Sequence, residues 1–479
     1  MKKKKTKIVA TIGPASDSSG VIEKMITKGV DIFRLNFSHG SHSEHLRVLR
    51  KIRRIAREQQ RTIGILQDIA GPKVRIGDIA HPFKLKKGDI ITLVPKEIVG
   101  KQTGKNRYKV SINYPEVLTR IRKGEHIYFY DGTIRARVIS TGDKVKALIE
   151  NDGVLSAKKG VNFPDTEIGI DILTEKDRKD LAWGVKHKVD LFAISFVQNA
   201  EDIRRVRRIL GDYDGKIIAK IEKFDAIAHI DEILEVSDGL MVARGDLGIE
   251  MPYAEVPLLQ KMLIGKANEH AKPIITATQM LLYMTHNRMA TRAEVSDVAN
   301  AVLDGTDAVM LSEESAVGED PVNAVATMSS IIRHAEKIYP YRRKKTWKHY
   351  DRSNIIERSV VNIADKMNAT AILSLTSSGW SAAKLSRFRP KSSIYAFSHK
   401  RRRLNQLTVL WGVEPIARIP VLSPSRMIQA VLQALDNEGK LDKEGLYIVT
   451  IGYPTGVPGS TNTIKILNAS EIRYYLSLK

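Results

Sequence analysis

The chain has 479 residues and no apolar run long enough to cross a bilayer, so a membrane-spanning protein is not expected. It contains no cysteine, which excludes disulfides, thiolate metal sites and a cysteine nucleophile. The composition, with 43% hydrophobic and 27% charged residues, is ordinary for a globular chain of several domains. The lysines at residues 2–5 lead directly into a strand-like run rather than a signal peptide, so we expect a soluble, cytoplasmic protein.

Short apolar runs that end in polar or charged residues recur along the chain. They lie at residues 7–13, 32–38, 63–68, 190–196, 216–222, 239–246, 273–279 and 308–312. Helix start signals stand between most of them, including capping boxes at Thr174 and Thr291 and a first-turn proline at Pro321. Strands alternating with helices in this way predict an α/β fold, a (β/α)8 TIM barrel with its active site at the carboxyl ends of the strands. We assign residues 1–72 and 165–340 to this barrel.

A long connection after the third strand breaks the alternation. Residues 73–164 carry short strand-like runs with turn signals and no clear helix. We predict an inserted β-barrel domain, which lies on the catalytic face because the βα loops emerge there. Such a domain can act as a lid that excludes water.

The alternation restarts after the basic run at residues 341–345. A helix is expected at 354–367, strands at 371–375 and 393–397, a helix at 426–435 and a strand at 446–451. Residues 346–479 are therefore predicted to form a separate C-terminal α/β domain.

Charged residues gather at the ends of two neighbouring barrel strands. Lys220 and Glu222 end one strand, and Arg244 and Asp246 end the next, so the four share one mouth. Two carboxylates flanked by cations suit Mg²⁺ and a phosphorylated or carboxylated substrate. The alternative from these residues alone is a structural ion-pair network at the barrel rim.

The net charge of +23 raises the alternative of a nucleic-acid-binding protein. Basic runs occur at residues 50–54, 204–208, 341–345 and 400–403. None carries an RNA-binding or zinc-finger signature, and several would form the outer face of a helix. The charge can equally steer small anionic substrates or favour solubility.

Several motifs, in order, resemble those of pyruvate kinases. They lie at residues 6–16 (TKIVATIGPAS), 34–40 (RLNFSHG), 71–72 (GP), 158–162 (KKGVN), 243–250 (ARGDLGIE), 277–280 (ATQM) and 291–300 (TRAEVSDVAN). The resemblance covers nearly the whole chain and is loose only near its end. It implies glycolytic transfer of the phosphoryl group of phosphoenolpyruvate to ADP, giving pyruvate and ATP, a regulatory C-terminal domain and a homotetramer.

The resemblance also implies the catalytic residues. Glu222 and Asp246 match the ligands of Mg²⁺ or Mn²⁺, and Lys220 matches the lysine that neutralises charge on the phosphoryl group and the enolate. Arg34 matches the arginine that clamps the phosphoryl group. The alternative for Lys220 is a rim salt bridge to Glu222.

Proton delivery and carboxylate binding are assigned in the same way. Thr278 matches a threonine beside the substrate carboxylate and the carbon to be protonated, and water held by Thr278, Ser312 and Glu314 is expected to deliver the proton. For Ser312 the alternative is a helix N-cap. The backbone amides of Gly245 and Asp246 are expected to receive the carboxylate.

The nucleotide is expected to meet residues of the second strand and of the lid. Asn36 lies in that strand and His39 just after it, whereas Arg75 and Lys159 lie at the two edges of the insertion and match lid residues that contact the phosphates. The alternative for Arg75 and Lys159 is a solvated surface.

One departure from the family pattern concerns K⁺. Many pyruvate kinases read Gly-Pro-Glu where this chain has Gly-Pro-Lys73, and the glutamate accompanies a bound K⁺. The residues that match the cation ligands are Asn36, Ser38, Asp68 and the carbonyl of Ile69. Because Lys73 supplies a positive charge itself, we expect that K⁺ is not required. The alternative is that Lys73 turns out to solvent and K⁺ binds as usual.

A second departure concerns the effector. Residues Thr376, Ser377, Ser378, Gly379 and Ser381 resemble the family's phosphate nest for a phosphorylated effector. The loop at 452–461 lacks the tryptophan and arginine that some fructose 1,6-bisphosphate-binding members have. The identity of the effector therefore stays open. The alternative is that Ser378 caps a helix.

A different enzyme class would use the same metal and enolate chemistry. An aldolase or lyase barrel acting on pyruvate-like enolates needs Glu222 and Asp246 but no lid that contacts a nucleotide, and it would not explain Lys159. Activity with phosphoenolpyruvate and ADP separates the two.

Overall fold

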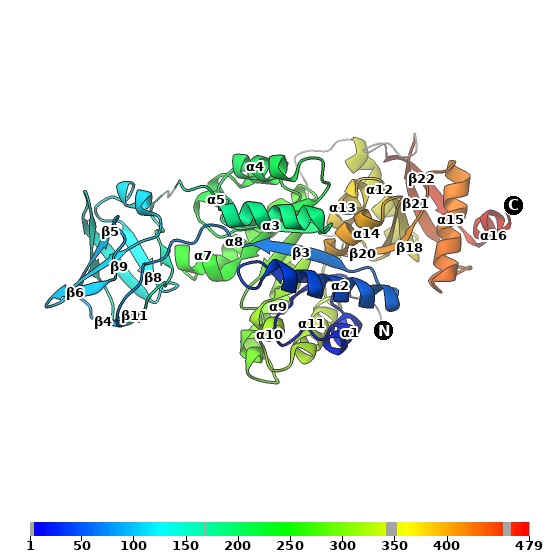
Figure 1. Cartoon of the computed structure of the whole chain (residues 1–479). Helices are drawn as coiled ribbons and strands as arrows, with labels where there is room; N and C mark the ends of the chain where they lie inside the picture. Colours follow the sequence, from blue (N-terminus) through cyan, green and yellow to red (C-terminus); the bar gives the residue numbers. More distant parts are fainter. Residues whose placement is uncertain (1–3, 167–168, 342–351, 454–460, 479) are drawn as a thin grey trace.

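A computed structural model describes residues 4–166, 169–341, 352–453 and 461–478. A β-rich insertion, a central barrel and a C-terminal α/β region follow one another across Figure 1. The basic residues 342–345 and most of the loop at 452–461 lie outside the described residues. The predicted domain boundaries themselves stay a prediction. None of the helices within the described ranges is long and apolar enough to cross a membrane.

The central barrel is a closed ring of parallel strands in the order β1-β17-β16-β15-β14-β13-β3-β2. The strands are β1 Lys7–Thr11, β2 Ile32–Asn36, β3 Gly64–Ile69, β13 Leu191–Ile194, β14 Lys216–Ile221, β15 Gly239–Ala243, β16 Ile274–Ala277 and β17 Ala308–Leu311. Each lies within or next to one of the predicted runs, so the TIM barrel is confirmed. Their near-continuous apolar character follows from burial on both faces.

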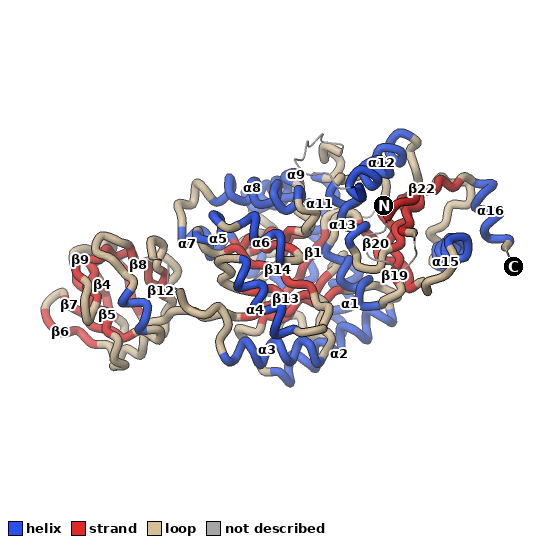
Figure 2. The backbone as a smooth tube through the Cα atoms, turned by 90° about the horizontal axis from the view of Figure 1, so that it is seen from above, coloured by secondary structure: helices blue, strands red, loops and turns tan. Residues whose placement is uncertain are grey.

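Helices surround the barrel (Figure 2), and buried apolar side chains of the longer ones belong to the barrel core cluster. They are α1 Ser19–Lys28, α2 His42–Glu58, α3 Glu175–Lys186, α4 Ala200–Leu210, α5 Asp225–Ala228, α6 Ile230–Val236, α7 Arg244–Glu250, α8 Val256–Glu269, α9 Arg292–Asp304, α10 Glu313–Ala316 and α11 Pro321–Ala335. The predicted capping boxes at Thr174 and Thr291 both form. Pro321 occupies the first turn of α11, as predicted.

The insertion between β3 and β13 is a β domain. A seven-stranded sheet has the order β12-β8-β9-β10-β5-β7-β6, and β11 pairs with β4. The strands are β4 Phe83–Leu85, β5 Ile90–Val94, β6 Lys101–Gly104, β7 Arg107–Ser111, β8 His126–Phe129, β9 Ile134–Ser140, β10 Val145–Ile149, β11 Gly153–Leu155 and β12 Val161–Asn162. Bridges from Arg75 to Gly160 and from Ile76 to Ile112 connect the regions of β12 and β7, so the sheet curls round its own apolar core.

The C-terminal region is a five-stranded sheet in the order β20-β19-β18-β21-β22, with β22 antiparallel at the edge. Its strands are β18 Ala371–Leu375, β19 Ser393–Ser398, β20 Val413–Arg418, β21 Tyr447–Gly452 and β22 Thr461–Leu467. Its helices are α12 Arg352–Lys366, α13 Trp380–Arg387, α14 Arg401–Gln406, α15 Pro424–Asn437 and α16 Ala469–Ser477. The predicted C-terminal α/β fold is confirmed.

The C-terminal region packs against the amino-terminal end of the barrel, away from the predicted active site. One buried apolar cluster contains Leu191 and Ile218 of the barrel together with Leu385 and Leu407. A buried ion pair adds to this contact, because Arg389 donates to Asp307 at 3.0 Å. The opposite, carboxyl end of the barrel is left facing the β insertion (Figure 1).

Candidate active site

Lys220, at the end of β14, is the centre of a charged cluster in the barrel mouth. Its Nζ lies 3.0 Å from Asp68 Oδ1, 2.9 Å from Glu222 Oε1 and 2.7 Å from Ser195 Oγ. The side chain is 12% exposed, so the ammonium is largely removed from bulk water but reachable from the mouth. The salt bridge to Glu222 that we considered as an alternative is therefore present, but it is one contact among three.

Arg34 completes the cluster from β2. Its Nε donates to Asp68 Oδ2 at 2.6 Å, and its Nη1 donates to Thr11 Oγ1 at 2.9 Å. The parallel register explains this contact, because Arg34 pairs with Thr11 on one side of β2, and Asn36 pairs with Asp68 on the other. Asp68 thus pairs with both Arg34 and Lys220 at the same level of the barrel mouth.

These contacts shift the pKa values of the cluster. Burial by itself would raise the pKa of Asp68, but the nearby Lys220 and Arg34 outweigh it and lower that pKa. Burial opposes the charged form of Lys220, but Asp68 and Glu222 outweigh it and raise the pKa of the ammonium. Both groups are therefore held in their charged forms at neutral pH.

Glu222 and Asp246 lie at the ends of adjacent strands and form the carboxylate side of the mouth. Glu222 Oε2 accepts the backbone N–H of Phe196 at 2.9 Å, and the residue is only 3% exposed. Burial, with a further contribution from the negative charge of Asp246, raises the pKa of Glu222 to about 7 despite Lys220. A divalent cation bound between the two carboxylates would relieve the repulsion between their negative charges. Within the described residues no group of three or more His or carboxylate ligands occurs, so the remaining ligands of such a cation would be water and substrate oxygens.

Thr278 lies in a strained turn just after β16. Its φ is +67° and that of Gln279 is +55°, in the left-handed region that β-branched residues avoid. Thr278 Oγ1 accepts the backbone N–H of Gly245 at 2.8 Å and donates to the carbonyl of Ala277 at 2.6 Å. One of the two amides expected to receive a substrate carboxylate is thus occupied by the threonine hydroxyl in this structure.

Arg244 does not point into the mouth as we expected from its place at the strand end. Its guanidinium donates to the carbonyls of Thr278 at 2.8 Å and Gln279 at 3.3 Å. Asp297 of α9 fixes the guanidinium at 2.6 Å. The residue therefore holds the strained turn that carries Thr278, because a planar fork of donors matches several carbonyls at once.

Ser312 follows β17 and lies next to the buried Glu314. No helix-capping hydrogen bond forms from its side chain, and its Oγ is buried without a hydrogen-bond partner among the described residues. Glu314 accepts the backbone N–H groups of Ser312 at 2.7 Å and Leu281 at 3.0 Å. Because the side chain makes no capping hydrogen bond, the geometry disfavours the cap interpretation of Ser312. A buried hydroxyl without a partner is costly, which suggests that it serves another purpose.

The residues matched to the K⁺ ligands lie around the ends of β2 and β3. Asn36 Oδ1 accepts the backbone N–H of Ser38 at 3.2 Å, and the carbonyl of Ile69 accepts Ser195 Oγ at 2.7 Å. Asp68 is already paired with two cations. Lys73 lies further along the chain, and its Nζ is 3.5 Å from Asp131 of the insertion.

The residues expected to meet the nucleotide are spread over two domains. His39 is exposed after β2, and its carbonyl contacts the ring of His45. In the insertion, Arg75 Nη1 donates to the carbonyl of Lys158 at 2.9 Å, and Lys159 Nζ lies 3.8 Å from the ring centre of Tyr130. The structure does not bring these lid residues to Lys220.

Two contacts of the cluster were not found by sequence reasoning. Ser195 bridges Lys220 and the carbonyl of Ile69, and Thr11 supports Arg34. Both stand at the carboxyl ends of strands that the sequence identified. Their position was therefore a signal, but a lone hydroxyl at a strand end is too common to single out.

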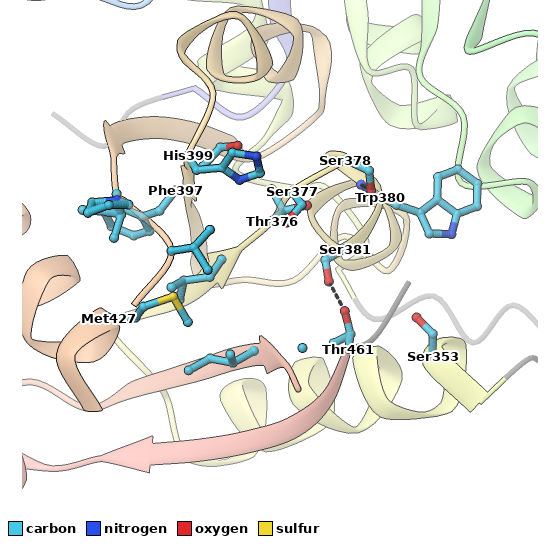
Figure 3. Close-up of a pocket in the computed structure, with 17 residues that line it drawn as sticks. Ser353, Thr376, Ser377, Ser378, Trp380, Ser381, Phe397, His399, Met427 and Thr461 are labelled. Atoms are coloured by element: carbon cyan, nitrogen blue, oxygen red, sulfur yellow. Dashed lines mark hydrogen bonds between the residues drawn. The ribbon is translucent and has the colours of Figure 1, made fainter. Parts of the chain in front are cut away.

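Four of the five expected effector residues, Thr376, Ser377, Ser378 and Ser381, line a pocket in the C-terminal domain (Figure 3), whereas Gly379 does not. Hydroxyl groups dominate its polar lining, from Ser353, Thr376, Ser377, Ser378, Ser381, Ser398 and Thr461. Gly379, with φ of +90°, is the residue just before α13, and its N–H donates to Thr376 Oγ1 at 2.9 Å. Within the described part of the chain, Ser378 Oγ makes only a long 3.4 Å contact with the N–H of Trp380, so it is a weak cap.

The family models match two regions of the chain. The model described as pyruvate kinase, barrel domain, matches residues 3–325, and the model described as pyruvate kinase, alpha/beta domain, matches residues 354–467. Together they cover most of the chain, including all eight barrel strands and the C-terminal sheet.

Individual relatives agree with the family models. Pyruvate kinases of Staphylococcus epidermidis and Staphylococcus aureus strain MRSA252 are 40% and 41% identical over 477 residues, which cover 97% of this chain and 80% of each relative. Among solved structures, a pyruvate kinase from Cryptosporidium parvum matches with a TM-score of 0.91 and 32% identity, over 97% of this chain and 96% of that chain.

Proposed function

The chain belongs to the pyruvate kinase family of phosphotransferases, and we propose that it transfers the phosphoryl group of phosphoenolpyruvate to ADP, giving pyruvate and ATP. The observation that carries this proposal is the contact of Lys220 with Asp68 and Glu222 in the barrel mouth, beside Arg34. A lactate-dehydrogenase-coupled assay with phosphoenolpyruvate and ADP tests it. Release of pyruvate only when ADP is present supports the kinase, whereas carbon–carbon bond cleavage would point to an aldolase or lyase.

A divalent cation, Mg²⁺ or Mn²⁺, is part of the proposal. Glu222 and Asp246 would hold it, since their mutual repulsion and the burial of Glu222 favour a neutralising charge between them. When bound, the cation supplies Lewis-acid polarisation of the phosphoryl oxygens. Calorimetric titration of the whole chain with Mn²⁺, before and after Glu222→Ala, tests this assignment.

Lys220 and Arg34 are proposed to bind the transferring phosphoryl group. Their charges are fixed in a largely buried mouth by Asp68, so they need little reorganisation when negative charge moves during transfer. Lys220 would also stabilise the enolate oxygen that remains after the phosphoryl group leaves. Arg34 offers the planar donor geometry suited to phosphate oxygens.

Proton delivery to the enolate carbon is proposed to run through water. Neither threonine nor serine is an acid near neutral pH, so Thr278 and Ser312 would orient the water rather than give up the proton themselves. The buried hydroxyl of Ser312, which has no hydrogen-bond partner among the described residues, has the hydrogen-bonding capacity for this role. The N–H groups of Gly245 and Asp246 would bind the substrate carboxylate once Thr278 releases Gly245.

The insertion is proposed to act as a lid over the nucleotide. Asn36 and His39 would meet the nucleotide from the barrel side, and Arg75 and Lys159 from the lid side. Two contacts already join the lid to the barrel mouth, because Asn162 donates to Glu250 at 2.9 Å and Gly132 lies against Ile249. Closure about these contacts would carry Arg75 and Lys159 toward the phosphates.

Independence from K⁺ is proposed as well. The carboxylate of Asp68 is already neutralised by Arg34 and Lys220, and the carbonyl of Ile69 already accepts a hydrogen bond from Ser195. These contacts leave Asp68 and Ile69 with little unmet demand for a cation unless further negative charge is placed beside them. Lys73 adds a further positive charge at the lid hinge.

The hydroxyl-lined pocket of the C-terminal domain is proposed to bind a phosphorylated effector. The start of α13 presents backbone N–H groups beside Thr376, Ser377 and Ser378, an arrangement that favours phosphate. A panel of phosphorylated metabolites should contain one that lowers the apparent KM for phosphoenolpyruvate. Ser378→Asp should abolish that response without lowering basal kcat, because the added negative charge repels phosphate far from the chemistry.

Assembly into a homotetramer completes the proposal. Tyr253, Leu258 and Met289 are 67%, 67% and 79% exposed around the outside of the barrel, and among the described strands the edge strand β22 pairs on one side only. Exposed apolar side chains of this size favour a subunit interface. Light scattering should give four times the 53.6 kDa chain mass. The cytoplasmic location stays a prediction.

A further inference from the structure

Two of the basic runs that the family resemblance does not explain form opposite walls of one cleft. One wall is α2 with the turn after it, which contributes Arg50, Arg53, Arg57 and Arg61. The other is α14, which contributes Arg401 and Asn405. The walls belong to the barrel and the C-terminal domain, and they approach each other although about 340 positions separate them in the sequence. Figure 1 shows α2 and α14 side by side.

Within the described residues, the arginines of this cleft form no direct ion pair with a carboxylate. No acidic side chain lines the cleft, and none of its five arginines forms an ion pair with the described residues. Arg53 is held by the carbonyls of His187 and Lys188 at 2.9 and 2.6 Å, and Arg57 by the carbonyl of Arg53 at 3.2 Å. Carbonyls orient a guanidinium without neutralising it. The charge of Arg53 acts on the buried Asp190, but burial still raises the pKa of Asp190 to about 7, so this carboxylate compensates the arginines only in part.

The positive charge of the cleft lowers the pKa of a neighbouring histidine. Burial and then the positive charges of Lys186, Arg50 and Arg53 lower the pKa of His187. Asp190 lies behind the cleft wall, 1% exposed, with its carboxylate accepting the N–H of Ile65 at 3.0 Å and Asn405 Nδ2 at 3.3 Å. Its oxygens are therefore turned to the barrel strand and to Asn405 rather than to the arginines.

The shape of the cleft limits what it can bind. It encloses about 400 Å³, and Ile52, Ala56 and Ile63 give it an apolar lining. Guanidinium groups on two facing helices match phosphate oxygens from both sides at once, whereas a single phosphate reaches few of them. A small molecule with two or more phosphate groups satisfies both walls.

We propose that this cleft binds an organic polyphosphate that bridges the barrel and the C-terminal domain. The bound phosphates would lie between Arg57 of α2 and Arg401 of α14, and Asn405 would donate from its amide. The cleft is separate from the hydroxyl-lined pocket, with which it shares no residue. This inference concerns binding and does not depend on the catalytic activity.

The test is calorimetric titration of the whole chain with inorganic tripolyphosphate in metal-free buffer. Ser378→Asp is used as the background, so that the hydroxyl-lined pocket does not contribute. Adding Arg57→Gln and Arg401→Gln should weaken binding about tenfold or more, because two charge-assisted contacts are lost. Both side chains are exposed, so the fold should persist. Arg54→Gln is the matched control, since Arg54 lies on the same helix outside the cleft and pairs with Glu58; it should leave the affinity unchanged.

Further titrations identify the source of the phosphates. Tighter binding of ATP than of tripolyphosphate would support the proposal and indicate a nucleotide, whereas tighter binding of a sugar bisphosphate would support it and indicate a sugar. Equal tripolyphosphate affinity with and without the Arg57 and Arg401 replacements would overturn the proposal. It would also be overturned if those replacements weakened binding of a DNA duplex only, because the arginines would then serve a nucleic-acid surface.

Discussion

Lys220 and Asp68 form an ion pair of 3.0 Å across the barrel mouth, although β13 separates their strands. Ser195, at the end of that intervening strand, accepts the Lys220 ammonium at 2.7 Å and so fills the space between them. The ammonium is therefore fixed by three strands at once. A cation placed in this way can respond to charge that develops during a reaction without moving.

Replacing Lys220 by methionine tests this role. We expect kcat to fall about a hundredfold to a thousandfold, because the lost charge acts mainly on the transition state. Mn²⁺ affinity, measured by calorimetry, should stay nearly unchanged, since Glu222 and Asp246 remain. Lys216→Met, at the other end of the same strand, is the control and should keep kcat. A kcat for Lys220→Met within about tenfold of the wild type would remove Lys220 from the mechanism.

Arg244→Lys tests the support of the Thr278 turn. The left-handed conformation of the β-branched Thr278 costs about 1–3 kcal/mol. The planar guanidinium of Arg244 binds two carbonyls and Asp297 at once, which the single ammonium of a lysine cannot do in the same geometry. Relaxation of the turn would misplace Thr278, so kcat should fall about tenfold to a hundredfold while Mn²⁺ affinity is kept. Asp297→Asn should act in the same direction. A wild-type kcat in both variants would show that the turn at Thr278 keeps its conformation without Arg244 and Asp297.

The sequence predicted the barrel well because its signals are local. Each strand is a short apolar run, and each run ends in the polar residues that form the mouth, as at Asp68 and Lys220. The direction in which a side chain points depends on contacts with residues that are distant in the sequence. Arg244 turns away from the mouth because carbonyls of the next βα loop and Asp297 are its partners. Lys73 likewise finds Asp131 in a separate domain, which no periodicity in the sequence could indicate.

Asp238 provides a pH-dependent contribution to stability at the opposite end of the barrel. Burial would raise its pKa, but Lys216 at 3.0 Å and Arg207 at 2.6 Å outweigh it and lower the pKa to about 2. A lowered carboxyl pKa stabilises the fold above the unfolded value, 3.8, and this contribution disappears as the pH falls through about 2.

Asp238→Asn should therefore be less stable than the wild type by about 2 kcal/mol at pH 6, with the difference shrinking between pH 4 and about 2. Urea unfolding at a series of pH values measures this difference. Asp231→Asn is the control, because its pair with Lys266 is 63% exposed on the carboxylate side and should contribute little. A difference for Asp238→Asn that is constant over this pH range would contradict the assignment.

Trp380 connects the hydroxyl-lined pocket to the barrel. It lines that pocket and a second cavity, which also contains Lys216 and Lys272 at the amino-terminal end of the barrel strands. Lys272 Nζ lies 5.2 Å from the centre of its ring. Trp380→Ala should keep the basal kcat but reduce the shift in KM that an effector produces, because the contact between the domains is lost. Met427→Ala, on the far side of the same pocket, is the control, and an equal loss of response in both would mean that only effector binding was damaged.

The last prediction is that the enzyme does not require K⁺, and that Lys73→Glu creates a requirement. Lys73 adds positive charge at the lid hinge, where its partner Asp131 is 3.5 Å away and both side chains are about half exposed, so the pair can separate when the lid closes. Glutamate would place negative charge there, which a monovalent cation bound by Asn36, Ser38, Asp68 and Ile69 would offset. Activity is compared in K⁺ and in tetramethylammonium buffers of equal ionic strength, with Lys84→Glu as a control elsewhere on the lid. Strong activation of the wild type by K⁺ would refute the idea, whereas activation confined to Lys73→Glu would confirm it.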